Sequence, residues 1–267
     1  MRLKITHLTE YVYDAPVAYA LQQLRLTPKV SAGQSILSWS TQVEGASREA
    51  AFTDQHNNHV ELLCYEPQRQ TVSILSQGEV ETATTHGVIG QHGGYAPLWY
   101  FQRPTRQTKA GPLIRGLVKA LGKGFDNDPA RLHGLSAAIL QAVTYETGKT
   151  DFTTSAEQAL EAGHGVCQDH AHIFVSAARL LGYPARYVGG YLLMDDRIEQ
   201  QAGHAWAEAH IEGLGWVGFD VSNGVSPDER YVRVSTGLDY GEAAPISGMI
   251  FGQTHETMSV SLRVEAA

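Results

Sequence analysis

The chain has two cysteines, and only one of them lies where a thiol could do chemistry. Cys167 follows Gly165 and Val166 and opens a run with apolar residues at helical spacing, so we expect it in the first turn of a helix. Unpaired backbone N–H groups and the helix dipole favour a thiolate there and can stabilise an oxyanion. Cys64 lies in an apolar, strand-like run and is interpreted as a buried small hydrophobe. Cys167 is therefore the candidate nucleophile.

A thiolate nucleophile needs a proton carrier, and imidazole suits this task near neutral pH. His204 opens a run in which small and large residues alternate, and Asp220 ends the strand predicted to follow it. A hairpin that folds near residues 212–213 would bring Asp220 opposite His204, where its carboxylate could hold the imidazole in the correct tautomer. Cys167, His204 and Asp220 together form a candidate catalytic triad.

The register of that hairpin decides whether the triad can form. If the turn centres on Leu214, Asp220 lies nearer Glu208, and a bulge or an offset is needed to restore its contact with His204. Considered alone, Asp220 could equally be a catalytic residue or an ordinary residue at a strand end or turn. The interpretation therefore depends on the three residues together.

Other histidines compete for the role of proton carrier. His170 and His172 share the predicted helix with Cys167, but they are two residues apart and cannot both face it. His164 precedes the glycine turn and could approach the sulfur. A zinc site made of Cys167, Asp169, His170 and His172 is a further alternative, although ligands crowded on one helix suit tetrahedral coordination poorly.

The N-terminal third has the period-two pattern of β-strands. The Asn57–Asn58 pair supplies a turn that tolerates positive φ. The predicted strands, at residues 2–13, 22–27, 36–44, 59–65 and 71–80, are sufficient for a small β-sandwich. Between residues 81 and 109 the periodicity fades into Gly, Pro, Thr and His, which indicates a connection.

The second half mixes helices and strands. Its helices are predicted at residues 112–121, from an N-cap at Asp128, from a capping box of Ser155 with Gln158, and at 167–181 before a C-cap at Gly182. Strands are predicted at residues 185–193, 204–211 and 216–221. We therefore expect an α+β protein with a β-rich domain at residues 1–90 and a second domain at residues 105–267.

Composition excludes several classes of function. The formal charge of −8 and the pI near 5.8 argue against a protein that binds nucleic acid, which would need clustered Lys and Arg. The polar and apolar residues alternate at the N-terminus, and no apolar run approaches bilayer-spanning length. We expect a cytoplasmic protein without a membrane partner, a metal or a cofactor.

Four blocks in fixed order resemble the core of the bacterial transglutaminase-like proteins of the papain-like cysteine superfamily. The blocks are residues 165–172, 182–191, 203–206 and 215–220. Residues 9–13 and 24–28 resemble the β-rich domain that precedes this core in many bacterial members. The resemblance implies a Cys-bearing helix packed on an antiparallel sheet, with Cys167, His204 and Asp220 as the catalytic triad.

The sequence departs from the family pattern near the site. His164 stands where members often have Arg, and Val221 and Ser222 stand where Pro and Thr are common. These departures bear on substrate preference more than on catalysis. The family's second oxyanion donor, a tryptophan in transglutaminases, has no assigned equivalent here, and Gln168 and Tyr145 are the candidates.

The chemistry implied by the resemblance is thiolate attack on an amide, which gives a thioester. Resolution by water would make the protein a thiol peptidase or amidase, and resolution by a lysine-type amine would make it a cross-linking transglutaminase. We favour hydrolysis of a peptide or isopeptide-like amide, because a simple pocket admits water. The partners are then a peptide or protein substrate and, for cross-linking, an amine acceptor. A non-catalytic binding module that retains the fold is the remaining alternative.

Overall fold

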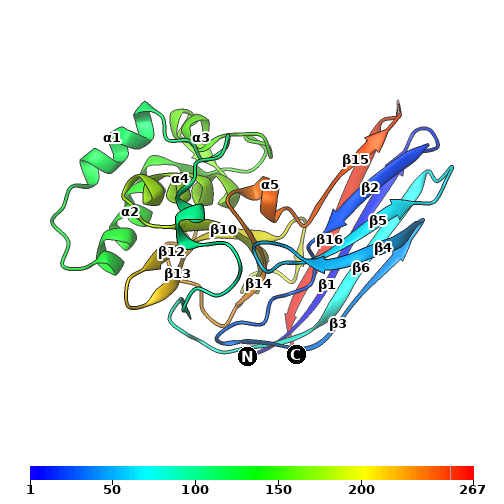
Figure 1. Ribbon diagram of the computed structural model, residues 1–267, viewed down its shortest axis with the longest axis horizontal. Helices are drawn as coiled ribbons and strands as arrows, with labels where there is room; N and C mark the ends of the chain where they lie inside the picture. Colours follow the sequence, from blue (N-terminus) through cyan, green and yellow to red (C-terminus); the bar gives the residue numbers. More distant parts are fainter. Residues whose placement is uncertain (253) are drawn as a thin grey trace.

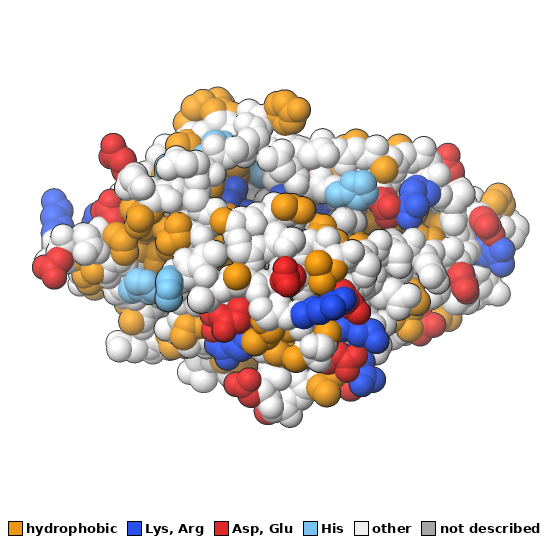
Figure 2. Space-filling model, turned by 90° about the horizontal axis from the view of Figure 1, so that it is seen from below, with side chains coloured by type: hydrophobic (Ala, Val, Ile, Leu, Met, Phe, Trp, Pro, Cys, Tyr) orange, Lys and Arg blue, Asp and Glu red, His pale blue; other side chains and the backbone are white. Residues whose placement is uncertain are grey.

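The computed structural model describes residues 1–252 and 254–267 and has the predicted α+β architecture (Figure 1). A β-rich part lies on one side and a mixed part that contains the helices lies on the other. The described residues contain no helix long and apolar enough to cross a membrane. On the face shown in Figure 2, acidic and basic side chains are interspersed.

The β-rich part is a sandwich of two sheets. One sheet has the order β11-β16-β1-β6-β3 and the other the order β15-β2-β5-β4. The strands are β1 (Arg2–Tyr13), β2 (Tyr19–Leu24), β3 (Gln34–Glu44), β4 (Ala46–Thr53), β5 (His59–Tyr65), β6 (Thr71–Thr82), β11 (Glu199–Gln200), β15 (Ile246–Phe251) and β16 (Glu256–Ala266). Alternate residues of β1, including Leu3 and Ile5, are fully buried because successive side chains of a strand point to opposite faces. The predicted sandwich is confirmed.

The two C-terminal strands return to this sandwich. Strand β16 pairs antiparallel with β1, from Leu3 opposite Ala266 to Tyr13 opposite Glu256, and β15 pairs antiparallel with β2. Strands β15 and β16 thus lie in the β-rich part, although they fall within the range predicted for the second domain. The division at residues 1–90 and 105–267 stays a prediction, and the pairing shows that the chain crosses between the two parts more than once.

The mixed part is built on a third antiparallel sheet, of order β14-β10-β12-β13-β7. Its strands are β7 (Val88–Gly90), β10 (Ala185–Leu192), β12 (His204–Ile211), β13 (Gly215–Phe219) and β14 (Tyr231–Gly237). The remaining elements are η1 (Leu98–Gln102), α1 (Pro112–Leu121), α2 (Asp128–Ala142), β8 (Thr144–Tyr145), α3 (Ala156–Ala162), β9 (His164–Gly165), α4 (Cys167–Leu180) and α5 (Tyr240–Ala243). Helix α4 lies against this sheet because Ala207 and Ala209 of β12 leave room for Phe174 and Ala178 in a shared core. The predicted packing of the Cys-bearing helix on an antiparallel sheet is confirmed.

The helix ends follow local signals, with two corrections. Ser155 and Gln158 form the predicted capping box. The C-cap of α4 is Leu181 and not the predicted Gly182, which follows it with a positive φ of 97°. The predicted N-cap at Asp128 is wrong, because the Oδ1 atom of Asn127 accepts the N–H of Ala130 at 2.8 Å and Asp128 already lies inside α2. An Asn one residue earlier provides the same capping chemistry.

A buried cluster of charged side chains connects strands β10, β12 and β14 of the sheet in the mixed part. The carboxylate of Glu208 is fully buried and accepts hydrogen bonds from Arg186 Nε at 2.6 Å and Arg233 Nε at 2.7 Å. Burial alone would raise the pKa of Glu208, but the two guanidinium groups outweigh burial and lower it to about 2. The charged form of Glu208 is therefore the form that the fold holds.

Replacing Glu208 with Gln should destabilise the protein by about 3–5 kcal/mol at neutral pH, because it leaves two buried guanidinium groups without their counter-charge. The folded pKa lies below the usual 4.5, so the stabilising effect is complete above about pH 4.5 and is lost as the pH falls through about 2. Urea unfolding should be measured at about pH 7 and at about pH 2.5. The free energies of unfolding of the variant and the wild type should converge in acid. Glu199→Gln, at an exposed pair with Arg263, is the control and should cost below about 1 kcal/mol.

Candidate active site

Cys167 is the first residue of α4, as predicted from the sequence. The carboxylate of Asp169 caps this helix by accepting the N–H of Val166 at 2.8 Å, and the hydroxyl of Thr150 donates to the same Oδ2 atom at 2.7 Å. First-turn N–H groups of a helix have no partner within it, so those of Cys167 and Gln168 are available to an oxyanion. Gly165 is required, because a Cβ there would lie 2.7 Å from the Cβ of Asp169.

His204 and Asp220 form a buried hydrogen-bonded pair. The Nε2 atom of His204 donates to Oδ2 of Asp220 at 2.6 Å, and the two residues are 8% and 0% exposed. The His204 ring stacks on Trp206 with the ring centroids 6.2 Å apart, which fixes its orientation. With Nε2 bonded to the carboxylate, Nδ1 is the ring nitrogen available for proton transfer.

The hairpin that presents this pair has a register between the two considered from the sequence. Ile211 pairs with Gly215 and Ala207 with Phe219, so the turn centres on Gly213, which has a φ of 81°. Continued in this register, Asp220 falls opposite Trp206 and not opposite His204. The His204 contact is therefore diagonal across the two strands, within the reach of long side chains.

Asp220 is held as a carboxylate by three further donors. Its Oδ2 atom also accepts from Asn223 Nδ2 at 2.6 Å and from the Tyr231 hydroxyl at 2.8 Å, and its Oδ1 atom accepts from the backbone N–H of Asn223. Burial would raise the pKa of Asp220, but the hydrogen bonds, first of all that from His204, lower it. Asn223 and Tyr231 are functional-site residues that sequence reasoning missed. Asn223 had a weak signal, since it follows the candidate carboxylate by three residues.

The environment of His204 favours its protonated form. Burial opposes charge on the ring, but the hydrogen bond with Asp220 and the influence of the Cys167 sulfur outweigh burial and raise the pKa of His204 to about 10. Cys167 and His204 also line the same cavity. The structure therefore places the hydrogen-bonded His204–Asp220 pair at the cavity that Cys167 also lines.

The competing histidines have other partners. His170 Nε2 donates to Val143 O at 3.0 Å and its Nδ1 accepts from the Ser222 hydroxyl at 2.8 Å, while burial lowers its pKa. His172 is fully buried, accepts the N–H of Tyr240 at 3.0 Å, and has its pKa lowered by burial to about 3. His164 lies in β9, paired with Thr144. Among the residues that the structure describes, no group of three or more His, Cys, Asp or Glu side chains is arranged to hold a metal, so the zinc alternative has no cluster to rest on.

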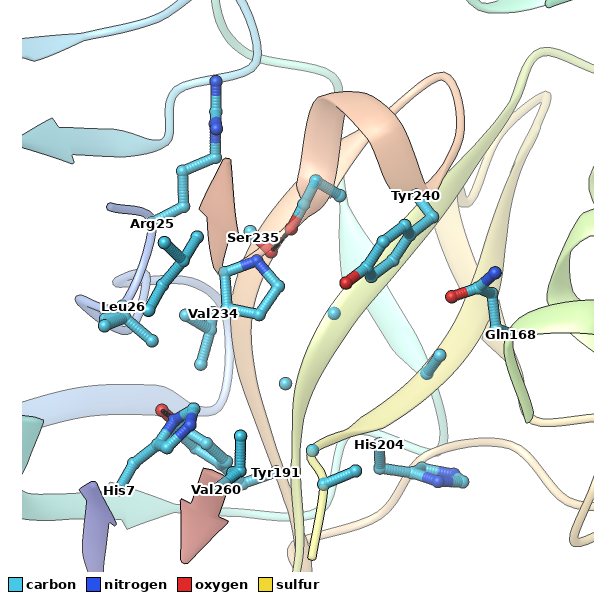
Figure 3. A pocket seen from close by; sticks show the side chains of 18 of the residues that line it. His7, Arg25, Leu26, Gln168, Tyr191, His204, Val234, Ser235, Tyr240 and Val260 are labelled. Atoms are coloured by element: carbon cyan, nitrogen blue, oxygen red, sulfur yellow. Dashed lines mark hydrogen bonds between the residues drawn. The ribbon is translucent and has the colours of Figure 1, made fainter. Parts of the chain in front are cut away.

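The candidate site opens into a cavity of about 310 Å³ between the two parts of the protein. Figure 3 shows Gln168, Tyr240 and His204 on one side, and residues of the β-rich part on the other. Of the two candidate oxyanion donors, Gln168 lines this cavity. Tyr145 lines a second cavity of about 670 Å³, which His204 also lines.

Comparisons with known proteins identify the same two regions. Residues 116–221 match the transglutaminase-like superfamily, and residues 3–81 match the bacterial transglutaminase-like N-terminal region. An uncharacterized protein of Mycobacterium leprae is 26% identical, covering 98% of each chain, and one of Mycobacterium tuberculosis is 27% identical, covering 96% of this chain and 90% of the relative.

A solved structure has the same fold over the whole chain. It is that of a candidate cysteine protease from Cytophaga hutchinsonii, with a TM-score of 0.79, 25% identity, and coverage of 100% of this chain and 91% of that one. The two family regions together include both parts of the fold and the segment from α1 to Val221 that holds Cys167, His204 and Asp220. The chain therefore belongs to the transglutaminase-like superfamily and carries its bacterial N-terminal region.

Proposed function

We propose that the protein is a cysteine-dependent acyl-transfer enzyme that hydrolyses peptide or isopeptide-like amides through a thioester on Cys167. The observation that carries the proposal is the His204–Asp220 pair, 2.6 Å between Nε2 and Oδ2, beside a cysteine at the start of α4. The likeness to a candidate cysteine protease supports the same chemistry.

The proposed reaction has two halves. The Cys167 thiolate attacks the amide carbonyl carbon, a C–S bond forms, and the oxyanion accepts hydrogen bonds from the first-turn N–H groups of α4. The C–N bond then breaks as the His204 imidazolium gives its proton to the leaving amine. In the second half, neutral His204 takes a proton from water, the water oxygen attacks the thioester, and the C–S bond breaks.

Water is the favoured acceptor because a second cavity gives access to His204. His204 lines the cavity of about 670 Å³ that also includes Tyr145, Asn223 and Tyr231. Such a space holds several waters next to the imidazole. An amine acceptor can enter by the same route, so the acceptor has to be decided by experiment.

Incubating the protein with a peptide library, with and without a primary amine, tests the proposal. We expect new carboxyl termini in both arms, read by mass spectrometry, because water resolves the thioester even when an amine is present. Incorporation of the amine without hydrolysis would replace the hydrolase by a cross-linking enzyme. No change in any peptide, with Cys167 no more reactive than Cys64 toward iodoacetamide near neutral pH, would favour a binding module.

A further inference from the structure

His204 lines two cavities, and only one of them is also lined by the candidate nucleophile Cys167. The cavity of about 310 Å³ is lined by Cys167, Gln168 and His204, whereas the cavity of about 670 Å³ includes His204 but not Cys167. In amide cleavage the acyl group stays on the sulfur, and the amine leaves after it takes a proton from the imidazolium. The smaller cavity is therefore on the acyl side of the bond, and the larger one is on the amine side.

The β-rich part supplies the far wall of the acyl-side cavity. Leu26 follows β2, Tyr11 belongs to β1, and Met258 and Val260 belong to β16. In Figure 3, Leu26 and Val260 stand across the open space from Gln168 and His204. On β16 the same face continues into the core through the fully buried Leu262, so the apolar surface of the cavity is an extension of the packed interior.

The polar groups of this wall are already satisfied by protein partners. His7 bonds the Tyr191 hydroxyl through Nδ1 at 2.9 Å and Thr9 through Nε2 at 3.3 Å, and burial lowers its pKa to about 4. Arg25 donates to the Asp54 carboxylate and to Gln23. No Asp or Glu is among the described residues that line the cavity. The wall can therefore contact a ligand without presenting a charged group that lacks a protein partner.

We infer that the N-terminal β-domain forms a substrate subsite that selects a bulky apolar side chain, such as Phe or Leu, on the acyl side of the bond that is cleaved. This inference rests on the proposed function and assigns the β-domain a role in it. Burying such a side chain against Leu26, Met258 and Val260 stabilises the complex, whereas a carboxylate would lose its hydration without gaining a partner.

The test uses dipeptidyl chloromethyl ketones, which alkylate the sulfur without requiring turnover. The probes carry Phe, Leu, Ala or Asp at either of the two acyl-side positions, and the rate of Cys167 alkylation is read by mass spectrometry. At one position, Phe and Leu should react about 10- to 200-fold faster than Ala, as expected for a hydrophobic pocket, and Asp should be slowest.

Two variants of one strand locate the subsite. Val260→Trp fills the cavity and should slow the Phe probe at least about 10-fold more than it slows iodoacetamide, which needs no subsite. Ser259→Trp places the same side chain on the exposed opposite face of β16 and should leave both rates unchanged. Met258→Trp, at a 55% exposed position of the same wall, replaces Val260→Trp if that variant does not fold.

Three results separate the inference from the proposed function. Fast alkylation of Cys167 with no preference among the four side chains would overturn the inference and leave the function standing. Equal slowing of the Phe probe by Val260→Trp and Ser259→Trp would also overturn it, because the effect would not come from the cavity. Alkylation of Cys167 no faster than that of Cys64 by every probe would overturn the proposed function itself.

Discussion

Replacing Cys167 with Ser is expected to lower the rate of peptide cleavage by about 10⁴-fold or more. The serine hydroxyl is nearly the same size as the thiol, so the packing of residue 167 against Ala171 and Tyr187 should persist. Its oxygen is a far weaker nucleophile than a thiolate at neutral pH, because a hydroxyl gives up its proton much less readily. Initial rates with the best library peptide measure the loss.

Cys64→Ser is the matched control, because it removes the other thiol. Cys64 is a half-buried residue of β5 and lines none of the cavities described above. This variant should keep the wild-type rate within about 2-fold, as expected for a residue far from the site. If Cys167→Ser kept a tenth or more of the activity, Cys167 would not be the nucleophile.

Asp220→Asn is expected to lower kcat by about 10²- to 10⁴-fold with a small change in KM. An amide in place of the carboxylate cannot stabilise the imidazolium, so the pKa of His204 should fall from about 10 and the ring can adopt the wrong tautomer. The pH–rate profile should therefore lose activity at a lower pH on its alkaline side. A purely structural residue would not move that limb.

Asp228→Asn provides the comparison for this result. Asp228 pairs with Arg230 near the amine-side cavity but has no hydrogen bond to His204. Its replacement should leave the pH profile in place. If Asp228→Asn and Asp220→Asn lowered kcat alike with unchanged profiles, Asp220 would have no specific part in proton transfer.

The parts of the fold that the sequence predicted are those encoded locally. Period-two alternation identified β1, β3, β5 and β6, and the capping box of Ser155 identified α3. Strand β4 was missed because its burial pattern does not alternate, with Arg48 and Glu49 among a run of exposed residues. Strand β2 lies about three residues before its predicted position, since its ends carry no strong turn signal.

Contacts between distant segments could not be predicted. Nothing near residues 246–266 indicates that β15 and β16 pair with strands at the other end of the chain, because strand partners are chosen by tertiary packing. For the same reason, the β-domain wall of the acyl-side cavity was not foreseen. Its members Leu26 and Val260 are more than 200 residues apart in the sequence.

The sequence indicated which residues make up the candidate site, but not how they are arranged. Cys167, His204 and Asp220 stood out because a thiol, an imidazole and a carboxylate each occurred at a helix or strand end. The diagonal His204–Asp220 contact depends on the turn at Gly213, and one residue of register separates the alternatives. Tyr231, which fixes Asp220, comes from β14, a strand that was not predicted although Pro227 and Asp228 precede it and Gly237 ends it.

Detection of the acyl-enzyme shows most directly whether Cys167 is the nucleophile. A peptide that the protein cleaves is mixed with excess protein, and the mixture is quenched in acid. Mass spectrometry then gives the intact mass of the protein and the residue that carries any added mass. We expect an added acyl group in thioester linkage on Cys167, which disappears in Cys167→Ser and accumulates in Asp220→Asn if the second half-reaction slows more. Cleavage that proceeds with no mass added at Cys167 would contradict this expectation.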